Sequence, residues 1–154
     1  MQGNAKVLEL LNEALSEELT AINQYFLHSE MLENWGYLNL NQAVKRESID
    51  EMKHAEALIE RILFLDGIPK MADLVSLNVG QDVKTQTEND LKLELGAVAM
   101  YNAAAQKAVE ADDNASRELF TRLLKDEEAH TDWFEAQLHT IKEMGIESYL
   151  AQQV

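Results

Sequence analysis

The sequence predicts an all-α protein in which four long helices form one bundle, with a long crossover between the second and third helices. The chain of 154 residues contains one proline and six glycines, whereas helix-favouring residues are plentiful. Apolar residues recur at intervals of three and four positions over four long stretches, as expected for helices with one buried face. Only the middle connection is long enough to cross a bundle. The length predicts a single domain, residues 1–154.

The first predicted helix runs from about Asn4 to Asn34, and Gly36 marks its end. On a helical projection, Glu18 and Tyr25 lie on the same stripe as the apolar residues of this helix. We therefore expect the Glu18 carboxylate to face the interior of the bundle.

The second predicted helix runs from about Asn39 to Asp66 and stops at Gly67-Ile68-Pro69. Glu51 lies on its inward stripe. A second apolar stripe lies to one side of the first, although a helix in a bundle needs only one apolar face. The extra stripe therefore indicates contact with another subunit. It consists of Ile49, Met52, Ile59 and Leu63.

Residues 67–81 form the one long connection, which allows the second and third helices to run parallel. The third predicted helix spans about Asp82 to Ala111, with Thr85-Gln86-Thr87-Glu88 as a capping box near its start. Glu94 and Tyr101 lie on its inward stripe, so their side chains are expected in the core.

The fourth predicted helix follows a tight turn at residues 112–114 and extends to about Met144, where Gly145 is a natural stop. Glu127 lies on its inward stripe. Residues 146–153 predict a short C-terminal fifth helix. Short connections on either side of one central crossover give the ferritin-like four-helix layout rather than a simple up-and-down bundle.

Two Glu-x-x-His sequences, Glu51–His54 and Glu127–His130, are the most informative motif in the chain. Residues three apart lie on one face of a helix, so each pair presents a carboxylate beside an imidazole. The two motifs are 76 positions apart, and the same shift relates three further pairs of identical residues. We interpret this recurrence as an internal pseudo-two-fold between two helix pairs. The further pairs are Glu18 with Glu94, Tyr25 with Tyr101, and Asp50 with Asp126.

Glu18, Glu51, Glu94 and Glu127 place four carboxylates on the inward stripes, and the two Glu-x-x-His motifs add two imidazoles, but no lysine or arginine lies there to pair with them. Unpaired carboxylates in a dry core cost several kcal/mol each, so packing alone does not explain four of them. Two divalent cations would balance the four negative charges while both imidazoles stay neutral. The alternative, solvated glutamates and ordinary core histidines, has to dismiss six inward positions at once. The predicted ligands are Glu18, Glu51, His54, Glu94, Glu127 and His130.

The composition of this ligand set restricts the metal. Carboxylate-rich sites with one histidine per metal suit iron or manganese better than zinc, which prefers tetrahedral sites richer in histidine or cysteine. Two such metals bridged by carboxylates can together pass two electrons to O₂ or peroxide. The sequence therefore predicts a redox-active pair of metal ions inside the bundle.

Four aromatic residues near these stripes have weaker assignments. Tyr25 and Tyr101 lie two turns beyond Glu18 and Glu94, from where they could hydrogen-bond to metal ligands. The other interpretation of both tyrosines, as core residues whose hydroxyls are satisfied elsewhere, is equally compatible with the pattern. His28 and His139 have no partner at ligand spacing, and we expect them to be ordinary surface or interface residues.

Several functions are excluded or disfavoured by bulk properties. The net charge of −15 opposes binding to nucleic-acid backbones, which requires a basic face. No apolar run approaches the length of a membrane span, and the N-terminus lacks the apolar core of a secretory signal. The absence of cysteine agrees with a cytoplasmic location. We therefore expect a cytoplasmic protein that binds neither nucleic acid nor membrane.

The chain resembles the bacterioferritins over its whole length. Bacterioferritins are haem-containing members of the ferritin-like superfamily, and long blocks of this sequence are similar to their characteristic motifs. These blocks are Asn23–His28, Glu47–Ala55, Ile59–Leu65, Asp126–His130 and Met144–Leu150.

The resemblance implies a ferroxidase centre with two iron ions per subunit. In this arrangement Glu18 and His54 hold one iron, Glu94 and His130 hold the other, and Glu51 and Glu127 bridge them. It further implies that Met52 and its counterpart in a second subunit ligate a haem b across a two-fold axis. Ligation by two thioethers leaves no open position on the haem iron, which suits electron transfer.

The same resemblance implies a homo-oligomeric shell of 24 subunits built from two-fold dimers, with Fe²⁺ and O₂ or H₂O₂ as substrates and a ferredoxin-type reductant as partner. The implied function is iron storage and detoxification, in which Fe²⁺ is oxidised to Fe³⁺ and stored as ferric mineral. An alternative is a di-iron or di-manganese peroxidase or oxygenase that forms no cage. One departure is Arg46, which stands where some relatives use a histidine for an iron site on the inner surface. Because a guanidinium cannot ligate a cation, the resemblance does not carry over to that site, nor to the route for electrons from the cavity that depends on it.

Overall fold

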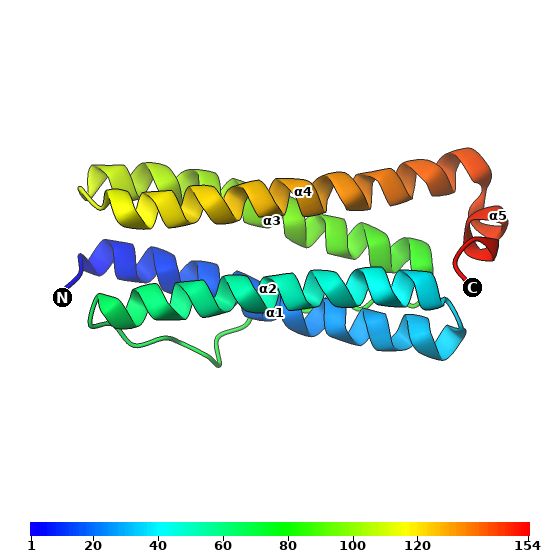
Figure 1. Ribbon diagram of the computed structural model, residues 1–154, viewed down its shortest axis with the longest axis horizontal. Coiled ribbons are helices and arrows are strands. Elements are labelled where there is room, and N and C mark those ends of the chain that lie inside the picture. Colours follow the sequence, from blue (N-terminus) through cyan, green and yellow to red (C-terminus); the bar gives the residue numbers. More distant parts are fainter.

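The computed structural model describes residues 1–154 and contains helices but no strands. Four long helices form an elongated bundle, and a short fifth helix closes one end (Figure 1). Helix α1 packs mainly on α2, and α3 packs mainly on α4. The helices are α1 (Ala5–Trp35), α2 (Leu38–Phe64), α3 (Val83–Glu110), α4 (Asn114–Met144) and α5 (Ile146–Ala151).

The connection between α2 and α3 runs back along the outside of the bundle, so that α2 and α3 point in the same direction (Figure 1). It covers residues 65–82 and contains no regular structure. This arrangement confirms the predicted crossover and the ferritin-like layout. None of the helices combines the length and the apolar character that crossing a membrane requires.

The helix termini follow the sequence closely but not everywhere. Gly36 ends α1 in the left-handed region at φ 89°, where glycine is favoured. The predicted capping box at residues 85–88 is wrong, because Asp82 is the N-cap of α3 and its Oδ1 accepts a hydrogen bond from the Thr85 backbone N–H at 2.8 Å. An aspartate in extended conformation directly before the helix satisfies the first free N–H groups better than a threonine inside the first turn.

Two other helix ends fall earlier than predicted. Helix α2 stops at Phe64, because Asp66 adopts a positive φ of 58° and the Gly67 N–H donates to the Ile62 carbonyl oxygen at 2.9 Å. That bond closes the last turn of the helix. The fifth helix ends at Ala151, two residues before the predicted Gln153.

Two apolar clusters fill the bundle, one toward each end. On α1, Glu18 lies between Leu15 of one cluster and Ala21 of the other, and Glu127 of α4 lies likewise between Leu123 and Phe134. Glu51 and Glu94 interrupt the apolar faces of α2 and α3 in the same way. The buried glutamates therefore form a polar layer across the middle of an otherwise apolar core.

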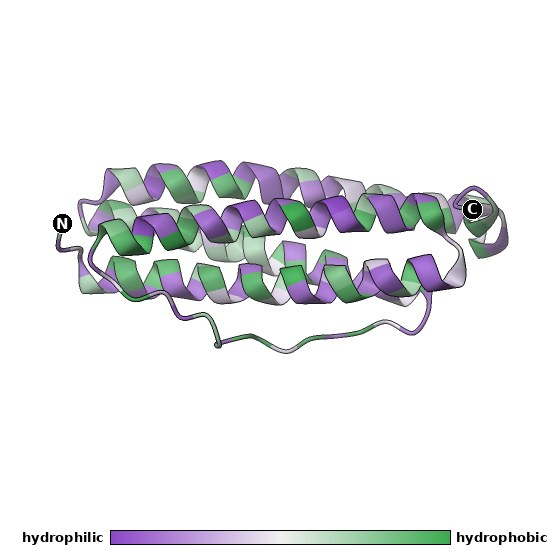
Figure 2. Cartoon of the chain, turned by 60° about the horizontal axis from the view of Figure 1, so that its bottom comes forward, coloured by the Kyte–Doolittle hydropathy of each residue, from purple (hydrophilic) through white to green (hydrophobic).

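Three of the four residues of the second apolar stripe on α2 are exposed in the single chain, whereas Ile59 is half-buried against the apolar core. Met52 is 55% exposed, and Ile49 and Leu63 are similarly uncovered. Apolar and polar residues are interspersed along each of the four long helices (Figure 2). Contiguous exposed apolar residues of this kind are typical of an interaction surface.

His28 is the clearest error of the sequence analysis. It is fully buried instead of lying at a surface, and its Nδ1 lies 2.8 Å from Asp90 Oδ1. The Gly80 N–H donates to His28 Nε2 at 3.0 Å, so the Nδ1 atom carries the proton and donates to the carboxylate. Gln24 also donates to Asp90 Oδ1, and its Oε1 accepts from the Asn78 N–H. This network fixes the end of the crossover to α1 and α3.

Candidate metal centre

Each long helix contributes one buried glutamate at mid-length, and α2 and α4 each add a histidine one turn later. The carboxylate-bearing residues are at most 2% exposed, and the two histidines at most 8%. All six predicted ligand residues are brought together in two overlapping groups, in each of which the ligand atoms lie within 4.8 Å of one another. The groups are Glu18, Glu51, His54 and Glu127, and Glu51, Glu94, Glu127 and His130.

In the first group, the Nδ1 atom of His54 faces three carboxylates. It lies 2.7 Å from Glu127 Oε1, 2.9 Å from Glu51 Oε2 and 3.4 Å from Glu18 Oε1. In the second group, His130 Nδ1 lies 2.8 Å from Glu51 Oε1 and 3.6 Å from Glu94 Oε1. The two imidazole rings are stacked with their centroids 5.9 Å apart.

Two of the glutamates belong to both groups. Glu51 presents Oε2 to His54 and Oε1 to His130. Glu127 does the same in mirror fashion, with Oε1 toward His54 and Oε2 at 3.8 Å from His130. A carboxylate that offers one oxygen to each of two positions has the geometry of a bridging ligand.

The outer ring nitrogens of the histidines also face carboxylates. His54 Nε2 lies 3.0 Å from Asp126 Oδ2, and His130 Nε2 lies 3.1 Å from Glu47 Oε2. A carboxylate at Nε2 favours the proton on that atom and leaves the lone pair of Nδ1 pointing inward, as metal ligation requires.

Tyr25 and Tyr101 hydrogen-bond to Glu94 and Glu18, the terminal glutamates, which each belong to only one of the two groups. The Tyr25 hydroxyl donates to Glu94 Oε1, and the Tyr101 hydroxyl donates to Glu18 Oε1. Burial and then the facing carboxylate, Glu94 for Tyr25 and Glu18 for Tyr101, raise the pKa of both phenols well above the usual value, so both remain donors. Each tyrosine thus bonds to the glutamate of the other half, and not to the one on its own helix.

The electrostatics of the cluster are those of a site built for cations. Burial and then Glu18 raise the pKa of Glu51 well above its usual range, and burial and Glu127 do the same for Glu94. Burial alone would lower the pKa of both histidines, but hydrogen bonds to the surrounding glutamates outweigh it and raise the pKa far above its usual value. The carboxylates therefore favour any positive charge placed between them.

The residues present fit two divalent cations. No lysine or arginine forms an ion pair with any of the four glutamates. Glu94 Oε2 is buried and accepts no hydrogen bond, which is costly unless another partner is bound. Glu127 Oε1 lies 2.7 Å from His54 Nδ1 but accepts no well-directed hydrogen bond there. Oxygen-rich coordination with one nitrogen per metal is the donor set of iron or manganese.

The cluster can be approached from two sides. A hollow of about 410 Å³ between α2 and α4 is lined by both histidines together with Asp50, Lys53 and Asp126. On the opposite side, between α1 and α3, the space beside Glu18 and Glu94 is only about 10 Å³. The α2–α4 side is therefore the roomier route to the cluster.

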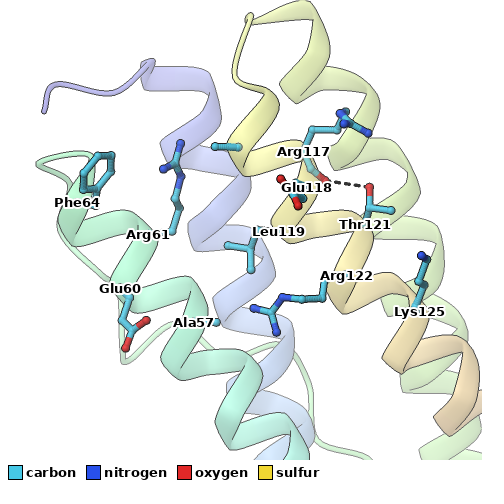
Figure 3. A pocket seen from close by; sticks show the side chains of 11 residues that line it. Ala57, Glu60, Arg61, Phe64, Arg117, Glu118, Leu119, Thr121, Arg122 and Lys125 are labelled. Atoms are coloured by element: carbon cyan, nitrogen blue, oxygen red, sulfur yellow. Dashed lines mark hydrogen bonds between the residues drawn. The ribbon is translucent and has the colours of Figure 1, made fainter.

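A second hollow on the α2–α4 side, of about 670 Å³, contains none of the six predicted ligands (Figure 3). Arg61 and Arg122 reach into it from α2 and α4, and Phe64 stands at its edge (Figure 3). Arg61 is held by Asp113 at 2.8 Å and Ser116 at 2.9 Å, so its charge is already compensated. This hollow adjoins the metal centre but is not part of it.

Glu47 is not among the six predicted ligands, although it lies one turn before Glu51 on the inward face of α2. Asp126 entered the prediction only as part of the internal repeat. The signal that points to both is position: Glu47 and Glu51 are four residues apart, and Asp126 directly precedes Glu127. Met52, in contrast, lies on the exposed stripe, away from the buried cluster.

Comparisons with known proteins agree with this architecture. A family model described as the ferritin-like domain matches residues 8–144. The bacterioferritins of Mycolicibacterium paratuberculosis and Mycobacterium leprae are each 47% identical over 154 residues, covering all of this chain and 97% of theirs. The bacterioferritin of Brucella melitensis is 44% identical over 149 residues, which cover 97% of this chain and 92% of that protein.

A solved structure described as that of mycobacterial bacterioferritin superposes with a TM-score of 0.99 at 45% sequence identity, covering all of this chain and 96% of that one. The similarity extends over the full bundle, including the crossover and the helices that carry the six ligands. The chain therefore belongs to the bacterioferritin family of ferritin-like proteins.

Proposed function

We propose that the protein stores iron and is a ferroxidase, oxidising Fe²⁺ to Fe³⁺ at an intrasubunit pair of metal positions with O₂ or peroxide as the electron acceptor. The observation that carries this proposal is the sharing of Glu51 and Glu127 between two ligand groups, each completed by one histidine and one further glutamate. Membership of the bacterioferritin family supports iron as the metal.

Each of the two metal positions has its own glutamate and histidine. Glu18 with His54, and Glu94 with His130, bind one Fe²⁺ each as substrate, and the two shared glutamates hold the ions close together. A pair of ions held in this way can donate two electrons to one acceptor. Tyr25 and Tyr101 donate hydrogen bonds to the carboxylates of Glu94 and Glu18, which restricts the rotation of these two carboxylates.

The proposed assembly is a hollow homo-oligomer, with the exposed stripe on α2 buried against a second subunit. An enzyme that uses the same ligands without a cage is the competing function. Gel filtration separates the two, because a 24-subunit shell of 17.5 kDa chains has a mass of roughly 420 kDa.

The test is aerobic loading with a large excess of Fe²⁺ followed by gel filtration and iron analysis. We expect the iron to elute with the large species, at far more than two ions per chain. Elution as a dimer with no more than two ions per chain would instead identify the cage-less enzyme.

We further propose that Met52 is the haem ligand contributed by each subunit. Its thioether lies on an exposed apolar stripe together with Ile49 and Leu63, which fits half of an apolar pocket that a second copy completes. The haem would supply a route for electrons, whereas the buried cluster supplies the oxidation of iron.

Replacing Met52 by leucine is expected to abolish haem binding, because leucine keeps the apolar stripe but cannot ligate iron. The Soret absorption of the protein reconstituted with haem measures this. Oxidation of Fe²⁺ is expected to continue at the wild-type rate, since Met52 does not contact the cluster. An unchanged Soret spectrum in the variant would show that another residue binds the haem.

A further inference from the structure

The internal pseudo-two-fold of the metal centre is broken at one position. A shift of 76 residues relates His54 to His130 and Asp50 to Asp126. Under the same shift, the counterpart of Glu47 is Leu123. Leu123 is fully buried in the apolar core, whereas the Glu47 side chain is 13% exposed and lies against His130. One histidine therefore has a nearly buried carboxylate at its outer nitrogen, and the other does not.

The two outer nitrogens are in different surroundings as a result. His54 Nε2 faces Asp126 at 3.0 Å, but the Asp126 side chain is 52% exposed and screened by water. His130 Nε2 faces Glu47 at 3.1 Å and Asp50 at 3.6 Å. Asp50 is more exposed than Glu47 and forms an ion pair with Lys53 at 3.7 Å. Of the two carboxylates near His130 Nε2, Glu47 is therefore the one whose charge is less offset by water and by a cation.

Glu47 Oε2 is also a buried acceptor without a hydrogen bond, despite its short distance to His130 Nε2. A modest rotation of the imidazole would align the N–H with this oxygen. Because His130 Nδ1 points at the shared glutamates, such a bond fixes the ring and increases the electron density on the ligating nitrogen. A carboxylate in this position behind a ligating histidine typically changes metal affinity by about 10-fold to 100-fold.

We propose that Glu47 is a positioning residue that makes the Glu94–His130 position bind a divalent cation more tightly than the Glu18–His54 position. The two positions then fill in order, with the His130 side first. The inference rests on the proposed function, because it requires a cation at each position.

A third cation between Glu47, Asp50 and His130 is a competing use of the same atoms, which lie within ligand distance of one another. It would require His130 to ligate through both ring nitrogens after losing both protons. The positioning role needs only the neutral imidazole, with Nε2 as donor. The two uses differ in stoichiometry, at two or three cations per chain.

The experiment is a titration of the metal-free protein with Co²⁺, followed by its visible absorption, for the wild type, Glu47→Gln and the matched control Asp126→Asn. We expect two Co²⁺ per chain in two resolved steps for the wild type. Glu47→Gln should weaken the tighter step by about 10-fold to 100-fold and leave the weaker step unchanged. Asp126→Asn should change only the weaker step, by about threefold or less, because its carboxylate is solvated.

Crystals soaked with one equivalent of Co²⁺ identify the position by anomalous scattering, which a purely structural effect of Glu47 would not alter. We expect the peak beside His130 in the wild type and no preference in Glu47→Gln. Equal occupancy in the wild type, a first peak beside His54, or a third Co²⁺ per chain would overturn the inference while leaving the proposed function intact. Absence of any Co²⁺ between the six ligands would overturn both.

Discussion

Replacing His130 or Glu18 by alanine removes the rapid phase of Fe²⁺ oxidation, with an expected loss of at least about 100-fold in the initial rate. Each substitution deletes one ligand that only a single metal position possesses. The shared glutamates still hold the other ion, but a lone Fe²⁺ can supply only one electron. Stopped-flow absorption after mixing with O₂, at two Fe²⁺ per chain, measures the rate.

Both substitutions have controls within the same helices. His139→Ala removes an exposed histidine of α4, and Glu13→Ala removes an exposed glutamate of α1. Neither side chain contacts the cluster, so both variants should oxidise iron at the wild-type rate. Circular dichroism at 25 °C should show the same helix content for all four variants, because the apolar clusters on both sides of the acidic layer are unchanged. His130→Ala should melt at a lower temperature than the wild type, because it removes a buried partner of the glutamates. Wild-type oxidation rates in His130→Ala and Glu18→Ala would disprove the assignment of ligands.

The second large effect is a reversal of the pH dependence of stability when metal is bound. In the metal-free protein, the glutamates hold the pKa of His54 and His130 far above the unfolded value of 6.5. The stabilisation from these groups is complete below about pH 6.5 and is lost as the pH rises above it. Glu51 and Glu94, whose pKa values are raised, act in the same direction because deprotonation in the core is unfavourable. The metal-free protein should therefore melt at a lower temperature at pH 8.5 than at pH 6.5.

Divalent cations displace these protons, so metal binding strengthens as the pH rises. Each imidazolium that becomes a ligand releases a proton, because only the neutral imidazole binds a metal. For each proton by which the folded and unfolded states differ, the free energy of unfolding changes by about 1.4 kcal/mol per pH unit. Each kcal/mol shifts the melting temperature by about 2–4 °C for a domain of this size. Differential scanning calorimetry with chelator or with Co²⁺ measures both slopes.

The double variant Glu51→Gln/Glu127→Gln provides the control for this reversal. It keeps the size of the side chains but removes the two shared carboxyl groups, which raise the pKa of both histidines and would bridge the metals. Its melting temperature should depend less on pH than that of the wild type, and Co²⁺ should no longer raise it. A wild-type metal-free protein with equal or greater stability at pH 8.5 would contradict the electrostatic description of the site.

Much of the fold was predictable because the spacing of apolar residues along each helix shows which face is buried. The inward stripes located all four buried glutamates, and the length of the central connection indicated that α2 and α3 run parallel. The six ligands could be grouped because both Glu-x-x-His sequences have a fixed geometry on a helix. The capping box failed because threonine-rich and aspartate caps compete locally, and only the backbone conformation at Asp82 decides between them.

The error at His28 and the contacts that periodicity left open share a physical origin, which is contact between segments distant in sequence. His28 is buried because the crossover folds back and places the Gly80 N–H against its Nε2, 52 residues further along the chain. The bond between Tyr25 and Glu94 joins α1 to α3, and a projection of either helix alone does not reveal it. The role proposed for Glu47 depends on its approach to His130 of α4, which the projection of α2 alone does not reveal. Periodicity shows which face of a helix is inward, but not which atom of another helix it meets.

The central claim is that the acidic layer in the middle of the core exists to bind two metal ions. The most direct test is a crystal structure of the protein soaked anaerobically with excess Fe²⁺, with anomalous data collected on both sides of the iron absorption edge. The account predicts two iron peaks among the six side chains, one beside each histidine, with Glu51 and Glu127 reaching both. The absence of iron between these residues, or side chains turned out to solvent, would contradict it.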